Sequence, residues 1–155
     1  MSAINVSTKV LIIDDDYAMT DLLKMVLEPQ NFEVHTINSG SSIAEVVREI
    51  DPEIVIIDLL MPGKDGWQVC REIRRFSQVP ILILSVVDKP GMVEHALDAG
   101  ADEYLLKPVP TYVLTARLNT LVRRARAEKM AAVSDRWKKN GCKHQIEIAH
   151  IWAMN

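Results

Sequence analysis

The stretch VLIIDDD, residues 10–16, sets four aliphatic residues directly before three aspartates. Similar apolar runs occupy residues 54–57, 81–84 and 104–106, and a weaker candidate occupies residues 32–37. Continuous aliphatic runs are typical of parallel strands that are covered on both faces, whereas half-exposed strands alternate apolar and polar residues. The sequence therefore predicts five parallel strands, four of them strongly marked.

Segments with helical periodicity separate these runs. Apolar residues recur at helical spacing within residues 19–27, 43–50, 67–76, 92–97 and 114–122. Strands that alternate with helices need crossover connections, which are right-handed and place helices on both faces of a sheet. We therefore expect an α/β fold with an open, doubly wound parallel sheet of five strands.

Length and composition limit the classes of function. The chain has 155 residues, of which 48% are hydrophobic and 25% charged, and no apolar run approaches the roughly 20 residues of a membrane span. The first nine residues lack the apolar stretch of a secretory signal, and Cys70 and Cys142 do not have C-x-x-C spacing. A net charge of -3 argues against general nucleic-acid binding. We expect a cytoplasmic protein with reduced thiols, no membrane contact and protein partners.

Polar residues stand where the predicted strands end. They are three consecutive aspartates, a fourth aspartate, a hydroxyl and an ammonium: Asp14, Asp15, Asp16, Asp58, Ser85 and Lys107. The carboxyl ends of strands converge on one crevice in a doubly wound sheet. Carboxylates brought together in this way need a cation, and oxygen ligands suit Mg²⁺ or Mn²⁺. The same groups suit phosphoryl transfer to a carboxylate.

Four segments together resemble the successive motifs of bacterial response-regulator receiver domains. They are VLIIDDD at 10–16, DLLMPGKDG at 58–66, PILILS at 80–85 and GADEYLLKP at 100–108. The resemblance implies a CheY-like, flavodoxin-like sheet of order 2-1-3-4-5 in a domain over residues 8–129. It also implies that Asp58 accepts a phosphoryl group from a sensor histidine kinase, which makes the chain a switch rather than an enzyme.

The resemblance implies a set of metal ligands. Asp15 would bind Mg²⁺ or Mn²⁺ directly, and Asp14 would act largely through water. Asp58 and the backbone carbonyl of Leu60 would complete the protein ligands.

Further roles follow from the same resemblance. Ser85 and Lys107 would bind phosphoryl oxygens, and Tyr104 would be the switch aromatic that turns inward when Ser85 moves toward the phosphoryl group. Asp16, in contrast, is expected to cap the following helix, because aspartate is favoured at helix starts.

Apolar residues stand at positions that influence water access in this family. These are Leu60, two residues after Asp58, and Val87, two residues after Ser85; Val86 also replaces a smaller residue. We hypothesise that the aliphatic side chains exclude water and give a long-lived phosphoprotein.

The last predicted helix, residues 111–126, resembles the closing helix of OmpR-like receivers. Those receivers dimerise through the fourth helix, fifth strand and fifth helix, which implies a homodimer here. Intermolecular ion pairs would join Asp98, Asp102 and Glu103 to Arg117, Arg123 and Arg124. A solvated charged surface is the alternative, because exposed ion pairs contribute only about 0–1 kcal/mol.

Residues 130–155 show no clear helical or strand period, and we expect an irregular tail of unknown role. OmpR-like proteins continue into a winged-helix DNA-binding domain, for which this tail is too short. We therefore expect no direct DNA binding by this chain, which would derive from a transcriptional regulator without that domain. An appended interaction segment is the alternative.

Two rival functions remain open. A receiver relative that docks without phosphorylation would keep the fold, although the full set of acceptor, hydroxyl and ammonium residues argues against it. An aspartyl-nucleophile phosphatase of the haloacid dehalogenase type would need a second acid two residues after Asp58, where Leu60 stands.

Overall fold

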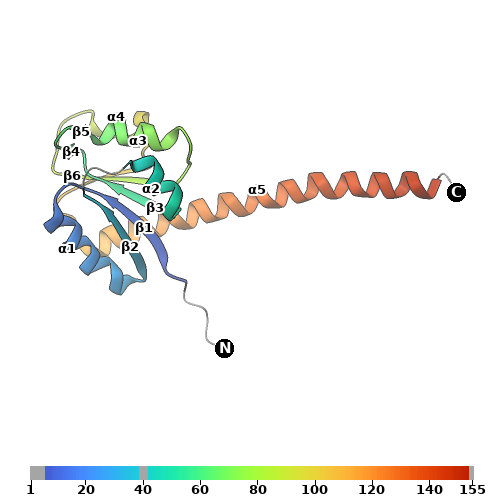
Figure 1. Cartoon of the computed structure of the whole chain (residues 1–155), viewed down its shortest axis with the longest axis horizontal. Coiled ribbons are helices and arrows are strands. Elements are labelled where there is room, and N and C mark those ends of the chain that lie inside the picture. The colour runs from blue at the N-terminus through green and yellow to red at the C-terminus, as the bar shows by residue number, and fades with distance from the viewer. Residues whose placement is uncertain (1–5, 39–41, 154–155) are drawn as a thin grey trace. The chain divides into compact units, whose positions relative to one another are not determined.

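The computed structural model describes residues 6–38 and 42–153, with side chains up to residue 140. The chain divides into two compact units, one reaching to Val122 and the other starting at Arg123. Figure 1 labels most of the elements along the chain. The N-terminal unit, as we call the part up to Val122, holds the whole sheet.

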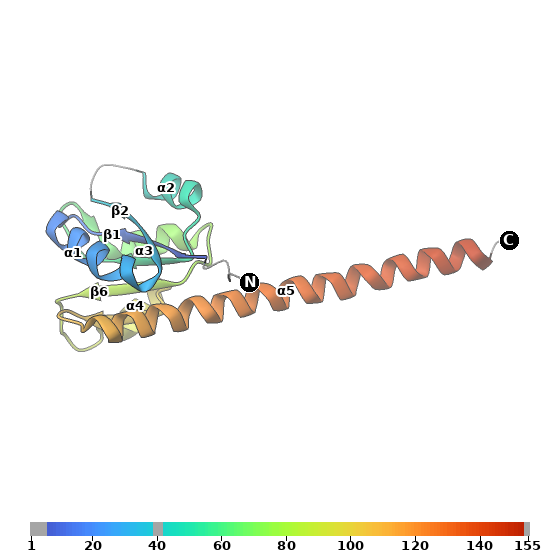
Figure 2. The ribbon, with the colours of Figure 1, turned by 90° about the horizontal axis from the view of Figure 1, so that it is seen from below.

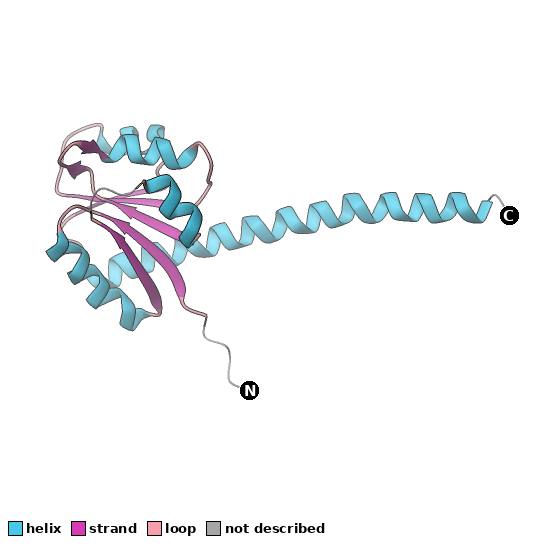
Figure 3. Cartoon of the chain, in the orientation of Figure 1, coloured by secondary structure: helices cyan, strands magenta, loops and turns pink. Residues whose placement is uncertain are grey.

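A five-stranded parallel sheet has the order β2-β1-β3-β6-β7. Its strands, shown in magenta in Figure 3, are β1 (Thr8–Ile13), β2 (Phe32–Ile37), β3 (Ile54–Ile57), β6 (Ile81–Ser85) and β7 (Glu103–Leu106). Counted along the chain, these five strands have the predicted order 2-1-3-4-5. The predicted doubly wound fold is therefore confirmed.

Helices cover both faces of the sheet, as Figures 1 and 2 show for α1 and α2. The helices of the N-terminal unit are α1 (Tyr17–Leu27), α2 (Ile43–Ile50), α3 (Gly66–Arg74), α4 (Met92–Ala99), a 3-10 turn at Glu28–Gln30 and the start of α5. Two buried clusters result, one beneath α2, α3 and α4 and the other beneath α1 and α5. The sheet is thus buried on both sides, which explains its uninterrupted aliphatic strands.

Side-chain caps fix where the helices begin. Asp16 accepts a hydrogen bond from the Met19 amide at 3.2 Å, as expected for a capping residue, and Asp65 accepts one from the Trp67 amide at 3.0 Å. Asp16 lies three residues after the end of β1, and Asp65 is the residue directly before α3. The caps therefore set the position of α1 and α3 relative to the ends of the strands.

A short antiparallel hairpin after β3 was not predicted. Its strands are β4 (Leu60–Met61) and β5 (Lys64–Asp65), and Gly63 has a φ of 71° in the turn between them. Two-residue strands are too short to show a period, so the sequence pattern does not reveal them. The hairpin leads the chain from Asp58 to the start of α3.

The prediction that the last helix ends near residue 126 was wrong. Helix α5 runs over Thr111–Ala153, so most of the expected irregular tail is helical. The residues that follow Val122 are largely strong helix formers, RRARAEKMAA, and a helix can continue on propensity without an apolar stripe.

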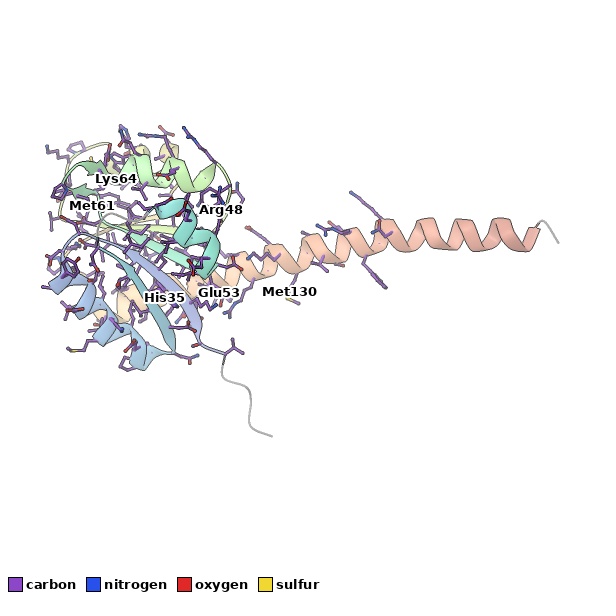
Figure 4. The ribbon with its side chains drawn as sticks, viewed as in Figure 1. His35, Arg48, Glu53, Met61, Lys64 and Met130 are labelled. Atoms are coloured by element: carbon purple, nitrogen blue, oxygen red, sulfur yellow. The ribbon has the colours of Figure 1, made fainter. Side chains whose placement is uncertain are left out.

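The second unit has little covered surface among its described side chains. From 123 to 140 only Ala125 is partly covered, and Met130, labelled in Figure 4, Val133 and Trp137 are all more than 60% exposed. Within the described part of the chain, no helix combines the length and apolar character that crossing a bilayer requires.

Candidate functional site

Three carboxylates meet at the carboxyl ends of two neighbouring strands. Asp14 and Asp15 follow β1 and Asp58 follows β3, and these strands pair with Ile13 opposite Ile57. One ligand atom from each carboxylate lies within 4.8 Å of the others. The Asp58 amide also donates to the Ile13 carbonyl at 3.0 Å, so the strand register holds the acids together.

Lys107 enters the same site from the end of β7. Its Nζ lies 3.5 Å from Oδ2 of Asp14 and 3.8 Å from Oδ2 of Asp58. Its amide donates to the Ser85 carbonyl at 2.8 Å, and its peptide bond to Pro108 is cis. Side chains predicted to share one crevice, from positions as distant as 14 and 107, therefore do lie together.

Burial opposes ionisation of the predicted phosphoacceptor. Burial raises the pKa of Asp58 above its usual value, the nearby Lys107 ammonium lowers it, and the Asp14 carboxylate raises it again. The amide of Leu60, 3.4 Å from Oδ1 of Asp58, favours the charged form. The site therefore combines three carboxyl groups with the single ammonium of Lys107, which cannot neutralise all of them when they are ionised.

The donor set fits a hard divalent cation. All three clustered side chains offer carboxylate oxygens and none offers nitrogen or sulfur, which is the preference of Mg²⁺ and Mn²⁺ rather than of Zn²⁺. A cation would also offset the like-charge repulsion that raises the Asp58 pKa. Asp14, Asp15 and Asp58 are therefore able to hold such an ion.

The predicted hydroxyl and switch aromatic are joined through one residue of the loop after β6. Ser85 is fully buried, and its Oγ accepts a hydrogen bond from the Val87 amide at 3.2 Å. The Tyr104 hydroxyl donates to the Val87 carbonyl. Burial raises the pKa of Tyr104, which keeps this hydroxyl protonated and able to donate.

Asn38 and Thr20 fasten the loop that carries the first acids, and neither was predicted. The Asn38 side chain donates to the Asp14 carbonyl and to Oγ1 of Thr20, both at 2.9 Å. The Asp14 carboxylate in turn accepts from the Asp16 amide at 2.9 Å. Asn38 directly follows β2, so its place at a strand end was the available signal.

Gly66 brings the start of α3 against the phosphoacceptor segment. A Cβ at this position would lie 2.6 Å from the Asp58 carbonyl oxygen and 2.8 Å from Cα of Leu59, closer than side chains approach backbone. Its amide donates to the Leu59 carbonyl at 3.3 Å. Only glycine allows this approach without a shift of the backbone.

The predicted interface residues divide into two groups. Asp98 is exposed on α4, and Arg123 and Arg124 are exposed on α5 in the second unit. Glu103 pairs within the chain with Arg117, at 3.4 Å.

Asp102, which was also expected at an intermolecular interface, takes part in the fold. Its Oδ2 accepts from Arg74, at 2.9 Å, and from the Ile81 amide, also at 2.9 Å. Arg74 donates further to the carbonyls of Gly100 and Val79, at 2.8 and 2.6 Å. This arginine, which the sequence pattern did not single out, ties α3 to the starts of β6 and β7.

Residues 10–119 match the family model described as the response regulator receiver domain. The chain is 38% identical over 124 residues to the transcriptional regulatory protein AfsQ1 of Streptomyces coelicolor. That alignment covers 80% of this chain but 55% of the relative, so the chain spans little more than half of that protein.

Solved receiver structures share the fold. The BeF3-activated N-terminal receiver domain of Klebsiella pneumoniae RstA superposes with a TM-score of 0.71 at 33% identity, covering 75% of this chain and 99% of that one. A receiver domain protein from Clostridium thermocellum gives 0.72 at 29% identity, covering 77% and 98%. With the family model matching most of the chain, this protein belongs to the response regulator receiver domain family of two-component signalling proteins.

Proposed function

We propose that Asp58 accepts a phosphoryl group from the phosphohistidine of a sensor kinase. A carboxylate oxygen of Asp58 bonds to phosphorus as the phosphorus–nitrogen bond breaks, and the electron pair of that bond returns to the imidazole. The supporting observation is the approach of Lys107 to within 3.8 Å of Asp58, because its ammonium can hold a phosphoryl oxygen there. Ser85, fully buried at the neighbouring strand end, would donate its hydroxyl to another oxygen.

Asp14, Asp15 and Asp58, with the backbone carbonyl of Leu60, would hold Mg²⁺ or Mn²⁺. When bound, the ion supplies positive charge for the phosphoryl oxygens. The chain's own contribution is to keep these oxygen ligands together before the ion arrives, through the β1–β3 register and the Asn38 hydrogen bonds.

Phosphorylation would act as a switch rather than as a turnover reaction. Movement of Ser85 toward the phosphoryl group would favour the inward position of Tyr104, in which the ring packs against the core and the hydroxyl donates to the Val87 carbonyl. The population of states of α4, β7 and α5 would then shift, and with it dimerisation or partner binding through that face. Exposed Val93 and Leu97 on α4 provide apolar contact area for this.

The kinase would dock beside the phosphoryl site on α1. An apolar cavity of about 370 Å³ is lined by α1, the loop after β6 and the start of α5, and Lys107 reaches it from the site. Leu22, Met25 and Val86 are more than 50% exposed around this region. Exposed apolar groups next to a reactive carboxylate suit a transient protein partner.

We also propose that the receiver spans residues 8–129 and belongs to a transcriptional regulator, with no DNA binding by this stretch itself. The relative AfsQ1 is a transcriptional regulatory protein. The lack of a second acid at Leu60, two residues after Asp58, favours a phosphoacceptor over a phosphatase of the haloacid dehalogenase type.

Incubation with Mg²⁺ and acetyl phosphate tests the proposal. We expect one base-labile, acid-stable phosphoryl group per chain in the wild type and none in Asp58→Ala. Asp21→Ala, which removes an exposed aspartate of α1, serves as the matched control and should still be labelled. Release of phosphate without any accumulated label would instead indicate a hydrolase, and an unlabelled wild type that releases no phosphate would indicate a docking module.

A further inference from the structure

The hydroxyl of Thr20 is a buried polar group that phosphoryl transfer itself does not use. Thr20 lies on α1, and 1% of its surface is exposed. Its hydroxyl donates to the Tyr17 carbonyl at 3.0 Å, one turn earlier in the helix. A hydroxyl carries a single hydrogen, so its oxygen is left to accept, and it accepts from the Asn38 side chain at 2.9 Å. The Thr20 hydroxyl therefore joins α1 to the residue that follows β2.

Asn38 uses its side-chain amide as a bridge. The Nδ2 atom lies 2.9 Å from Oγ1 of Thr20 and 2.9 Å from the carbonyl oxygen of Asp14. Neither partner can donate to Asn38, because a carbonyl has no hydrogen and the Thr20 hydrogen is directed to Tyr17. The two amide hydrogens of Asn38 thus have one acceptor each, one on α1 and one on the loop that carries the acids.

The bond to Asp14 fixes the backbone from which Asp15 projects. These acids lie between β1 and α1, where no strand or helix bonds hold the chain. The Asp14 amide donates to the Ile37 carbonyl at 3.1 Å, and the Asp14 carbonyl accepts from Asn38. That carbonyl and the Asp15 nitrogen belong to one planar peptide unit, so holding the oxygen also holds the start of Asp15.

This support matters because the acids repel one another. Asp14, Asp15 and Asp58 bring ligand oxygens within 4.8 Å of one another, and like charges at such distances favour separation. A loop that is free to move would let Asp15 swing away, and a cation would then have to bring it back. Hydrogen bonds that hold the Asp14–Asp15 peptide in advance remove that cost from cation binding.

We propose that Thr20 and Asn38 are positioning residues that set the affinity of the acid cluster for a divalent cation. The inference rests on the metal site of the proposed function and adds the Thr20 hydroxyl to it. Thr20 acts through Asn38, and Asn38 acts through the Asp14–Asp15 peptide, so neither side chain has to touch the ion. Groups that orient metal ligands in this way change metal affinity by about 10- to 100-fold.

Thr115 offers a matched comparison for Thr20. It is also a buried threonine on a helix, 9% exposed, and its hydroxyl donates to the carbonyls of Thr111 and Tyr112, at 2.9 and 3.2 Å. Both of these bonds stay within α5. Thr115→Val therefore makes the same chemical change as Thr20→Val without removing a bridge to the acids.

Titration with Mn²⁺, followed by the electron paramagnetic resonance signal of the free ion, measures affinity without a phosphodonor. We expect about 10- to 100-fold weaker binding for Asn38→Ala and at least about 3-fold weaker binding for Thr20→Val. Thr20→Ser, which restores the hydroxyl, and Thr115→Val should both bind as the wild type does. Wild-type affinity in Asn38→Ala or in Thr20→Val would overturn the inference, as would equal weakening by Thr115→Val.

A double variant tests the order of the contacts. Thr20→Val should weaken Mn²⁺ binding no further in the Asn38→Ala background, because the hydroxyl acts only through the amide. If the two effects are instead additive, Thr20 does not act through Asn38 and the inference fails.

The magnesium dependence of labelling separates positioning from damage to the site. With acetyl phosphate, Thr20→Val should raise the Mg²⁺ concentration that gives half the maximal labelling rate by at least about 3-fold and should reach the wild-type rate at saturation. A lower rate at saturation with an unchanged midpoint would overturn the inference. If the wild type binds Mn²⁺ but Asp58 takes no label, the proposed function fails and the Mn²⁺ titration still supports the inference. If the wild type binds no Mn²⁺, both fail.

Discussion

Lys107 and Asp14 form an ion pair with 3.5 Å between Nζ and Oδ2, although 93 positions separate them in the chain. Both side chains are largely buried, with 14% and 3% exposed. Lys107 supplies one positive charge, whereas Asp15 and Asp58 add carboxyl groups beside the pair, so further positive charge is needed to stabilise the site. The ends of the strands therefore bring the ion pair together and also create the need for a cation.

Magnesium should stabilise the fold at neutral pH. At tenfold excess over its Kd, an ion that binds the folded state alone adds about 1.4 kcal/mol, or about 5 °C in Tm. Thermal unfolding with and without Mg²⁺ measures this, and Asp15→Asn should abolish the gain. Asp16→Asn, at the exposed cap, is the control that should retain it.

Without Mg²⁺, the contribution of Asp58 to folding stability should fall as the pH rises. This is opposite to ordinary acid denaturation, in which stability falls as the pH is lowered. The pKa of Asp58 is raised on folding, so between its unfolded value of 3.8 and its higher folded value the native state binds more protons. Stability from this group is therefore present below pH 3.8 and is lost as pH rises through the folded pKa. Asp58→Asn should stabilise the metal-free protein at pH 7, and a fall in Tm would contradict this.

Gly66→Ala should impair both stability and phosphorylation. The added methyl would meet the Asp58 carbonyl oxygen at 2.6 Å, and forced overpacking costs about 1–3 kcal/mol. The displaced Asp58 should accept phosphate from acetyl phosphate roughly 10- to 100-fold more slowly. Gly63→Ala is the control, because residue 63 has a φ of 71° but an added methyl there would meet no atom within 4 Å. It should retain the phosphorylation rate, which would show that the steric clash at Gly66, rather than backbone strain in this loop, slows the reaction.

Much of this site was predictable because its residues follow strongly marked strands. The run Ile54–Ile57 is a strand with the predicted bounds, and Asp58 follows it directly. Parallel strands of a doubly wound sheet end at one edge, so the meeting of Asp14, Asp58 and Lys107 needed only the order of the polar residues. The roles of these residues in phosphoryl transfer stay predictions.

Other features depend on contacts that leave no period in the sequence. Arg74 looks like one of several surface arginines at the end of α3, yet it is 17% exposed and bonds to three carbonyls and to Asp102. The helical continuation past Val122 has no buried apolar stripe to mark it, since the described side chains from residue 123 to 140 are exposed except for the partly covered Ala125.

Arg74→Ala should destabilise the N-terminal unit by about 2–4 kcal/mol, because it leaves carbonyl groups and the Asp102 carboxylate without their donor. Arg71→Ala, one turn earlier and exposed, should change stability by no more than about 0.5 kcal/mol. Urea denaturation compares the two. Equal effects would show that the Arg74 hydrogen bonds contribute little.

Truncation should locate the end of the receiver within α5. A chain that ends at Lys129 loses, among the described side chains, only exposed ones. Its free energy of unfolding should lie within about 0.5 kcal/mol of that of the full chain. A chain that ends at Asn119 also loses the buried Leu121 and Val122, which should cost about 3–6 kcal/mol. Loss of stability in the first truncation would place the boundary beyond residue 129.

The aliphatic residues around the acceptor should prolong the life of the phosphoprotein. The Leu60 amide donates to Asp58 and the Val87 amide donates to Ser85, so both residues lie next to side chains that would hold a phosphoryl group. A polar or acidic side chain there could orient or deprotonate an attacking water, whereas leucine and valine offer no such group. Leu60→Asn combined with Val87→Glu should therefore speed phosphate release by roughly tenfold or more, followed as loss of label after removal of acetyl phosphate.

Leu97→Asn is the matched control, because Leu97 on α4 is 56% exposed against 58% for Leu60, and it should release phosphate at the wild-type rate. An unchanged rate in the double variant would mean that water reaches the acyl phosphate by a route these side chains do not guard.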